Sequence, residues 1–158
     1  MKVLFKNSRV VVSQKQETYA KFGMSDATIE AFTSKYSADA RYRGINYGSK
    51  KTSKVRFYVL EGGYTITIAT GALGEALTTV TTMTGVAGWM EYTFPEPLPA
   101  GTFVLLNGRG VSYVAGTSKP TEEFDYYAID DLGQGGTVHQ QTGTGGSYPG
   151  MQLYMLEE

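Results

Sequence analysis

The chain has no cysteine and only one histidine and one tryptophan among its 158 residues. The lack of cysteine rules out a disulfide framework and a thiolate metal site, and it leaves the redox compartment open. A zinc site needs several nitrogen or sulfur ligands, and His139 alone cannot supply them. A Ser-His-Asp hydrolase would have to use the same histidine, yet no serine lies in a G-x-S-x-G motif. These absences argue against zinc enzymes and serine hydrolases.

Long apolar runs are missing too. The N-terminal sequence MKVLFKNSRVVV has only three apolar residues before Lys6 and Asn7, too few for the apolar core of a signal peptide. No run elsewhere is long enough to span a bilayer. We therefore expect a protein made in the cytoplasm, without a signal peptide and without a membrane partner.

Nucleotide and metal motifs are also absent. The 20 glycines fit neither G-x-G-x-x-G nor G-x-x-x-x-G-K-[ST]. The acidic segment 122–131 has enough carboxylates for a calcium site or a glycosidase pair, but it lacks the D-x-D-x-D-G spacing. A solvated turn is the favoured interpretation of this segment. We predict no cofactor, no metal and no enzymatic activity.

Strand-forming residues and turn signals dominate the chain after Ser53. Alternation over 54–60 and 64–68, around Glu61-Gly62-Gly63, predicts a β-hairpin. Further strands are predicted over 73–83, 88–94, 102–106, 111–115, 126–129 and 151–156. We expect an all-β fold, a two-sheet antiparallel β-sandwich with jelly-roll or immunoglobulin-like topology.

Two segments interrupt this strand pattern. Pro95, Pro97 and Pro99 remove backbone donors at alternate positions, so the strand from Gly88 should end there in an extended crossover. The following strand, 102–106, is apolar on both faces and should lie centrally in a sheet. The polar, glycine-rich segment 133–150 is predicted to be a long exposed loop.

The first 53 residues differ from the rest, and we predict an N-terminal basic arm or adaptor over 1–53 before a sandwich domain over 54–158. Residues 2–13 suit a short strand or extended arm. Ser25 can cap a helix, and apolar residues at helical spacing predict a short helix over 26–36. Residues 37–53 are polar and contain glycine, which indicates a connector or exposed loop.

The net charge of −1 conceals a strong asymmetry. Residues 1–60 carry twelve Lys/Arg and four acids, a net +8, whereas the remainder carries two Lys/Arg and eleven acids, a net −9. Such opposite fields favour packing of the two parts or head-to-tail docking. For the basic segment 41–56, a solvated face and docking onto an acidic protein surface are equally favoured interpretations. The acidic second part of the chain disfavours binding of nucleic acid. The docking candidates are Arg41, Arg43, Lys50, Lys51 and Lys54.

Aromatic side chains raise the question of sugar binding, because carbohydrate-binding sandwiches stack pyranose rings on exposed aromatics. For Trp89, packing in the core or at its rim is favoured over sugar stacking by roughly two to one. His139 is treated as an ordinary loop residue. The candidates for surface or glycan contacts are Trp89, Tyr113, Tyr126, Tyr127, His139 and Tyr148.

The second part of the chain contains W-x-E-Y-x-F from Trp89, L-P-A-G-T-F from Leu98, and the closing GGSYPGMQLYML. With these motifs, residues 54–158 resemble β-sandwich modules of carbohydrate-binding proteins and of tailed-bacteriophage virion proteins. The whole chain resembles a phage head fibre, capsid decoration or tail-associated protein. In such proteins the N-terminal part commonly anchors to the particle and the sandwich faces outward.

The resemblance implies a non-enzymatic structural component of a virion. Its partners would be other virion proteins with an acidic capsid or neck surface, further copies of itself, with a trimer as one form, and a cell-surface glycan. The alternative is a carbohydrate-binding β-sandwich module.

Overall fold

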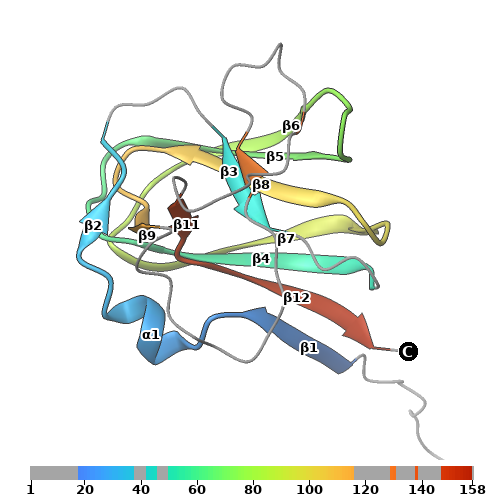
Figure 1. Cartoon of the computed structure of the whole chain (residues 1–158), viewed down its shortest axis with the longest axis horizontal. Coiled ribbons are helices and arrows are strands. Elements are labelled where there is room, and N and C mark those ends of the chain that lie inside the picture. Colours follow the sequence, from blue (N-terminus) through green and yellow to red (C-terminus); the bar gives the residue numbers. More distant parts are fainter. Residues whose placement is uncertain are drawn as a thin grey trace, which may run out of the picture.

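The structure, a computed structural model, describes residues 18–37, 42–45, 50–115, 129–130, 138 and 147–157 (Figure 1). Over these ranges the chain is mostly β-strand in antiparallel sheets, with one five-residue helix, α1 (Asp26–Glu30). The all-β prediction is therefore confirmed. The strand or arm predicted over 2–13 lies outside the described residues.

The strands form three sheets. The four-stranded sheet has the order β1-β12-β4-β7, the five-stranded sheet β10-β3-β8-β5-β6, and the three-stranded sheet β11-β9-β2. The bounds are β1 Thr18–Gly23, β2 Ser34–Lys35, β3 Arg43–Ile45, β4 Thr52–Val59, β5 Thr65–Gly71, β6 Thr78–Thr84, β7 Gly88–Leu98, β8 Phe103–Gly108, β9 Ser112–Ala115, β10 Ile129–Asp130, β11 Ser147–Pro149 and β12 Met151–Glu157.

Antiparallel pairs in the two larger sheets are nested along the chain. The innermost pair is β5 with β6, followed outward by β4 with β7, β3 with β8, and β1 with β12. The pairs alternate between the five-stranded and the four-stranded sheet. These eight strands are therefore nested in pairs like the two arms of one long hairpin that pass from sheet to sheet.

Both larger sheets contribute to one buried apolar cluster. Phe57 of β4 and Leu153 of β12 share it with Ile68 of β5 and Val104 of β8, and all four are fully buried. The alternate residues of β8, Phe103 and Leu105, form a second small cluster. The prediction that this strand is central and apolar on both faces is confirmed, because β8 lies between β3 and β5.

The predicted hairpin over 54–68 is wrong. Strand β4 pairs with β12 and β7, whereas β5 pairs with β6 and β8 in the other sheet. The turn at Glu61-Gly62-Gly63 thus passes between sheets. Alternation gave each strand a buried face, but it did not specify which strand would be its hydrogen-bonding partner.

The predicted strand end at Pro95 is also wrong, because β7 continues through Pro95 and Pro97 to Leu98, which pairs with Thr52. The strand tolerates these prolines because it lies at the edge of its sheet and needs donors on one side only.

Three other expectations changed in part. The helix predicted over 26–36 gives way to β2 at Ser34–Lys35. The connector predicted over 37–53 contains β3, and the strand predicted over 73–83 begins at Thr78. Of the loop predicted over 133–150, Val138 is fully buried and Ser147–Pro149 is a strand.

Residues on both sides of the predicted domain boundary at 53/54 share structure. The boundary falls inside β4, and β1 pairs with the C-terminal strand β12. Met24, Ile29 and Ile45, all before the boundary, belong to the same buried cluster as the strands that follow it. The described part of 1–53 is therefore integrated into the fold.

Candidate functional site

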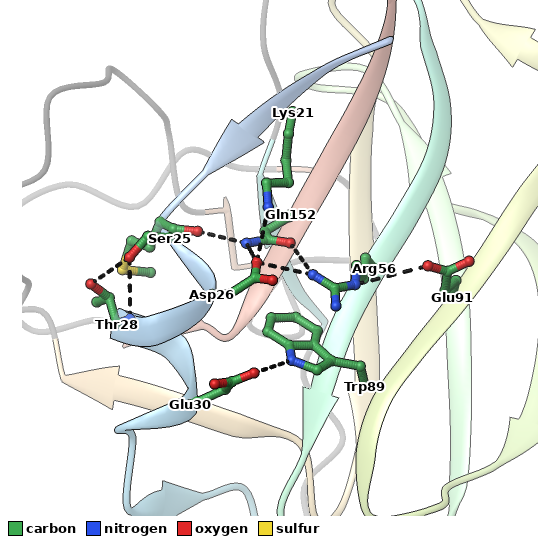
Figure 2. A network of polar contacts seen from close by, with 10 residues as sticks. Lys21, Ser25, Asp26, Thr28, Glu30, Arg56, Trp89, Glu91 and Gln152 are labelled. Carbon is green, nitrogen blue, oxygen red and sulfur yellow. Dashed lines mark hydrogen bonds and ion pairs between the residues drawn. The ribbon is translucent and has the colours of Figure 1, made fainter.

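The densest polar cluster that the structure describes surrounds Asp26, at the start of α1 (Figure 2). One oxygen of this carboxylate, Oδ1, accepts hydrogen bonds from three side chains. Gln152 Nε2 lies at 2.8 Å, and Lys21 Nζ and Arg56 Nη1 both lie at 3.0 Å. The three donors come from β12, β1 and β4, so the cluster connects the helix to three strands of the four-stranded sheet.

Strand register explains why these residues meet. Gly23, Gln152, Arg56 and Glu91 are successive cross-strand partners in β1, β12, β4 and β7, so they form one row across the sheet. The chain leaves β1 at Gly23 with a φ of 131°, in the region that favours glycine, and turns into α1. This turn brings Asp26 over the row.

The start of α1 has a standard N-cap. Ser25 is extended, and its Oγ accepts a hydrogen bond from the backbone N–H of Thr28 at 3.2 Å. Asp26 in the first turn complements the positive end of the helix. Ile29 is fully buried in the main cluster. The helix is thus held by polar contacts at its start and by the apolar packing of Ile29.

Gln152 is the buried centre of the cluster and is fully shielded from solvent. Its Nε2 also donates to the Met24 carbonyl at 2.8 Å, and its Oε1 accepts from Arg56 Nη1 at 3.1 Å. A buried amide needs such partners because leaving them unmade costs about 1–3 kcal/mol per group. Gln152 therefore orients both the chain before α1 and the guanidinium of Arg56.

Trp89 forms the next layer of the cluster. The Arg56 guanidinium lies 3.8 Å from the centre of the indole ring. The centres of the Tyr58 and Trp89 rings are 5.0 Å apart. The indole Nε1 donates to Glu30 Oε2 at 2.7 Å, which ties the end of α1 to β7. Trp89 packs beside the main cluster, as the rim interpretation of this residue requires.

Electrostatics make the Asp26 carboxyl a poor proton acceptor. Hydrogen bonds from Gln152, then Lys21 and Arg56, hold its pKa well below the ordinary value of 3.8, against the opposing effect of burial. A carboxylate held ionised by three donors suits an anchor, since a general base needs a pKa near the working pH. The chemistry of this cluster is therefore that of fixing α1 to the sheet.

The described docking candidates are divided between the two larger sheets. Arg43 lies in β3 of the five-stranded sheet, whereas Lys54 lies in β4 of the four-stranded sheet. Lys54 Nζ is 3.3 Å from Glu91 Oε1 and 4.4 Å from the Tyr154 ring centre. Lys50 and Lys51 immediately precede β4, and Arg41 lies outside the described residues.

Two of the predicted contact residues lie near a second aromatic group. The rings of Tyr36 and Tyr113 stack with centres 4.4 Å apart, and the Arg43 guanidinium lies 4.3 Å from the centre of the Tyr36 ring. Tyr36 Oη and Ser147 Oγ are hydrogen-bonded at 2.8 Å. Tyr148, the next residue of β11, packs against the main cluster. The structure therefore brings Arg43 and Tyr113 to one site through Tyr36, which the sequence did not single out.

The remaining predicted contact residues, Tyr126, Tyr127 and His139, lie outside the described residues. The acidic segment 122–131 is described only at Ile129–Asp130, whose side chains are not. Elsewhere in the described ranges, no group of three or more His, Asp or Glu is placed to hold a metal ion. The described part of the chain contains no helix long and apolar enough to cross a membrane.

The segment around β6 is exposed and carries no charge. From Ala76 to Met90 the sequence has no charged residue, and this segment includes all of β6. Leu73 and Val86, on either side of β6, are 52% and 64% exposed, the two large apolar side chains most clearly open to solvent among the described residues. Sequence reasoning missed this surface, although the absence of charge over 76–90 was visible.

Comparison with known proteins yields no match to a family model, to a curated protein or to a solved structure.

Proposed function

We propose that this chain is a non-enzymatic structural component of a bacteriophage virion, acting by docking to other virion proteins. The capsid decoration, head fibre and tail-associated roles, with attachment to a host surface, all remain within this proposal. The observation that carries it is the pairing pattern of the strands.

The nested pairs support a jelly-roll form of the β-sandwich. The four nested pairs comprise eight strands, which alternate between two sheets in the way that a rolled-up long hairpin requires. Jelly rolls occur in viral capsid proteins and in lectin domains, so this topology favours the two functions suggested by the sequence motifs. Fold alone does not choose between them.

The use of charged residues favours a structural role. Arg56 forms ion pairs with Asp26 and Glu91, and Lys54 forms an ion pair with Glu91. These contacts hold the fold together. The uncharged surface around β6, by contrast, is exposed and has the composition of a protein-binding edge.

Co-sedimentation tests this proposal. The purified chain, mixed with particles of the phage that encodes it, should co-sediment with them, and immunogold labelling should detect the native protein on intact particles. Absence of the chain from purified particles, together with no binding to them, would contradict the proposal.

The electrostatic part of docking is tested separately by neutralising the five docking candidates together. Binding should weaken, and it should weaken more at low salt than at moderate salt, because exposed charges are screened. The control neutralises Lys35, in β2, and Arg109, in the turn between β8 and β9, both of which are exposed. Unchanged binding by the five-residue variant at both salt concentrations would refute electrostatic docking.

Carbohydrate binding is the second candidate function, and the stack of Arg43, Tyr36 and Tyr113 favours it. Trp89 is a weaker sugar platform, because both Arg56 and Tyr58 pack on its ring and its N–H is donated to Glu30, whereas Tyr113 stacks on Tyr36 alone among the described contacts. A glycan array with wild type, Tyr113→Ala and Trp89→Ala separates the two functions. Binding that is lost in Tyr113→Ala and retained in a Tyr64→Ala control would support the carbohydrate-binding alternative.

A further inference from the structure

Val138 is described apart from its neighbours in the sequence, and it is fully buried. Its backbone carbonyl accepts a hydrogen bond from the Gly74 N–H at 2.8 Å, and its own N–H donates to the Glu75 carbonyl at 2.9 Å. Both partners belong to the connection between β5 and β6, in which Leu73 forms an isolated parallel bridge with Val138. This connection therefore holds both polar groups of the Val138 backbone.

The side chain of Val138 is held by residues of two strands. It packs with Phe103 and Leu105 of β8 in the small apolar cluster, which Leu77 adjoins. Gly71, at the end of β5, leaves the space that the valine fills, because a Cβ at this position would lie 2.8 Å from Val138 Cγ2. The backbone and the side chain of Val138 are thus both fixed by residues that lie far from it in the sequence.

The small cluster lies apart from the main one. Side chains of β8 alternate between the two, with Val104 in the main cluster and Leu105 in the small cluster, on opposite faces of the sheet. Among the described residues, the small cluster has three buried members, whereas the main cluster draws buried residues from both larger sheets. Loss of the Val138 contact would therefore leave the main cluster in place.

The connection that holds Val138 is itself exposed. Leu73, Gly74, Glu75 and Ala76 all lie at the surface, and Leu73 is 52% exposed. The two hydrogen bonds come from this short connection and not from a strand ladder. Few buried apolar neighbours and hydrogen bonds at an exposed backbone are features of segments that open locally, at a lower free energy than the whole domain. The contact of Val138 has both features.

We infer that Val138 and the β5–β6 connection form a latch, which closes one part of the outer face of the five-stranded sheet and opens while the two larger sheets stay folded. Opening breaks the two backbone hydrogen bonds and separates Val138 from Phe103 and Leu105. Gly71 permits closure, because a Cβ there would occupy the place of a valine methyl group. The latch is a property of the fold and does not depend on whether the chain acts in a virion or binds sugar.

Native-state amide hydrogen exchange of the full chain tests the latch, because the N–H groups of Gly74 and Val138 are the donors in its two hydrogen bonds. After correction for intrinsic rates, they should exchange roughly a hundredfold faster, or more, than the amides of Val55 and Phe57 in the inner strand β4. Low urea should leave latch exchange unchanged and speed exchange in β4, since only global unfolding exposes much surface. Equal rates and equal urea dependence in the two sets, or no protection at Gly74 and Val138, would overturn the inference.

Three variants separate the latch from the main cluster. Val138→Ala removes buried methyl groups and Gly71→Ala adds a Cβ against the valine, so each should speed exchange at the two latch amides roughly tenfold or more. The effect of Gly71→Ala should largely disappear when it is combined with Val138→Ala. Val104→Ala, the same truncation in the main cluster, is the matched control, and it should speed exchange in β4 and leave the latch amides unchanged. Latch amides that respond to Val104→Ala as strongly as those of β4, or that respond to neither latch variant, would overturn the inference.

Discussion

Gln152 donates a hydrogen bond from Nε2 to Asp26 Oδ1 at 2.8 Å, joining residues 126 positions apart in the sequence. The same nitrogen donates to the Met24 carbonyl, so one buried amide fixes both the chain before α1 and its first residue. The C-terminal strand therefore determines where the N-terminal helix lies. This dependence is the basis of the first two predictions.

Replacing Gln152 with leucine should destabilise the fold by about 2 kcal/mol. The change introduces an apolar side chain of similar size, takes the amide donor away from the Met24 carbonyl and removes one of three donors to Asp26. Urea denaturation measures the loss as a lower midpoint. Thr93→Val, an exposed change on the same sheet, is the control and should alter the midpoint little. Equal midpoints for Gln152→Leu and wild type would show that the amide does not hold α1.

The depressed pKa of Asp26 predicts a specific acid sensitivity. Between the lowered folded-state pKa and 3.8, the unfolded chain binds more protons at this carboxyl than the folded chain does. The carboxylate's contribution to stability is therefore complete above pH 3.8 and is lost as the pH falls through the folded-state pKa. The side chain is 41% exposed, so screening keeps the effect modest.

Asp26→Asn is the variant that isolates this effect. Thermal melts of wild type and variant between roughly pH 5 and pH 2 should show a stability advantage for wild type that shrinks as the pH falls. Glu96→Gln, a change at an exposed carboxylate of β7, controls for general titration. A difference between wild type and Asp26→Asn that stays constant across this range would contradict the prediction.

Local patterns in the sequence were enough to locate several strands. The runs that became β8 and β12 alternate or are apolar throughout, and such runs specify a strand whatever its neighbours are. Local patterns did not predict which strands pair, as the wrong hairpin between β4 and β5 shows. A glycine turn suits both a hairpin and a passage between sheets, and only long-range packing distinguishes them.

The cluster around Asp26 could not be predicted from the sequence, for a similar reason. Ser25 and Asp26 were readable as a helix start, but their partners come from β12 and β4, which local patterns do not connect. One signal was present in the sequence of β12, where the polar Gln152 stands among apolar neighbours. A polar side chain in such a strand needs a buried partner, and its identity required the structure.

Ser112 offers a test of an imperfect contact in the interior. Its side chain is fully buried, and Oγ has no hydrogen-bond partner in the described structure. Ser112→Ala removes this unsatisfied group and should stabilise the fold by about 1 kcal/mol. Ser53→Ala is the matched control, because Ser53 is also buried but its Oγ donates to the Tyr154 carbonyl at 3.3 Å. Differential scanning calorimetry should show a higher melting temperature for Ser112→Ala and a lower one for Ser53→Ala, and the opposite order would contradict this account.

Gly44 shows how closely β3 and β8 approach each other. A Cβ at Gly44 would overlap the carbonyl oxygen of Val104, a backbone atom that can move only if the two strands separate. Gly44→Ala should therefore cost about 3 kcal/mol or more, or prevent folding. Gly63→Asn is the control, because Gly63 has a φ of 97° and open space around its Cβ position. Asparagine is among the residues enriched at positive φ and meets no atom here, so the control should be the less damaging of the two changes. Urea denaturation measures both losses of stability. If Gly63→Asn lost more than Gly44→Ala, backbone conformation would limit substitution at these glycines, and the close approach of β3 to β8 would not.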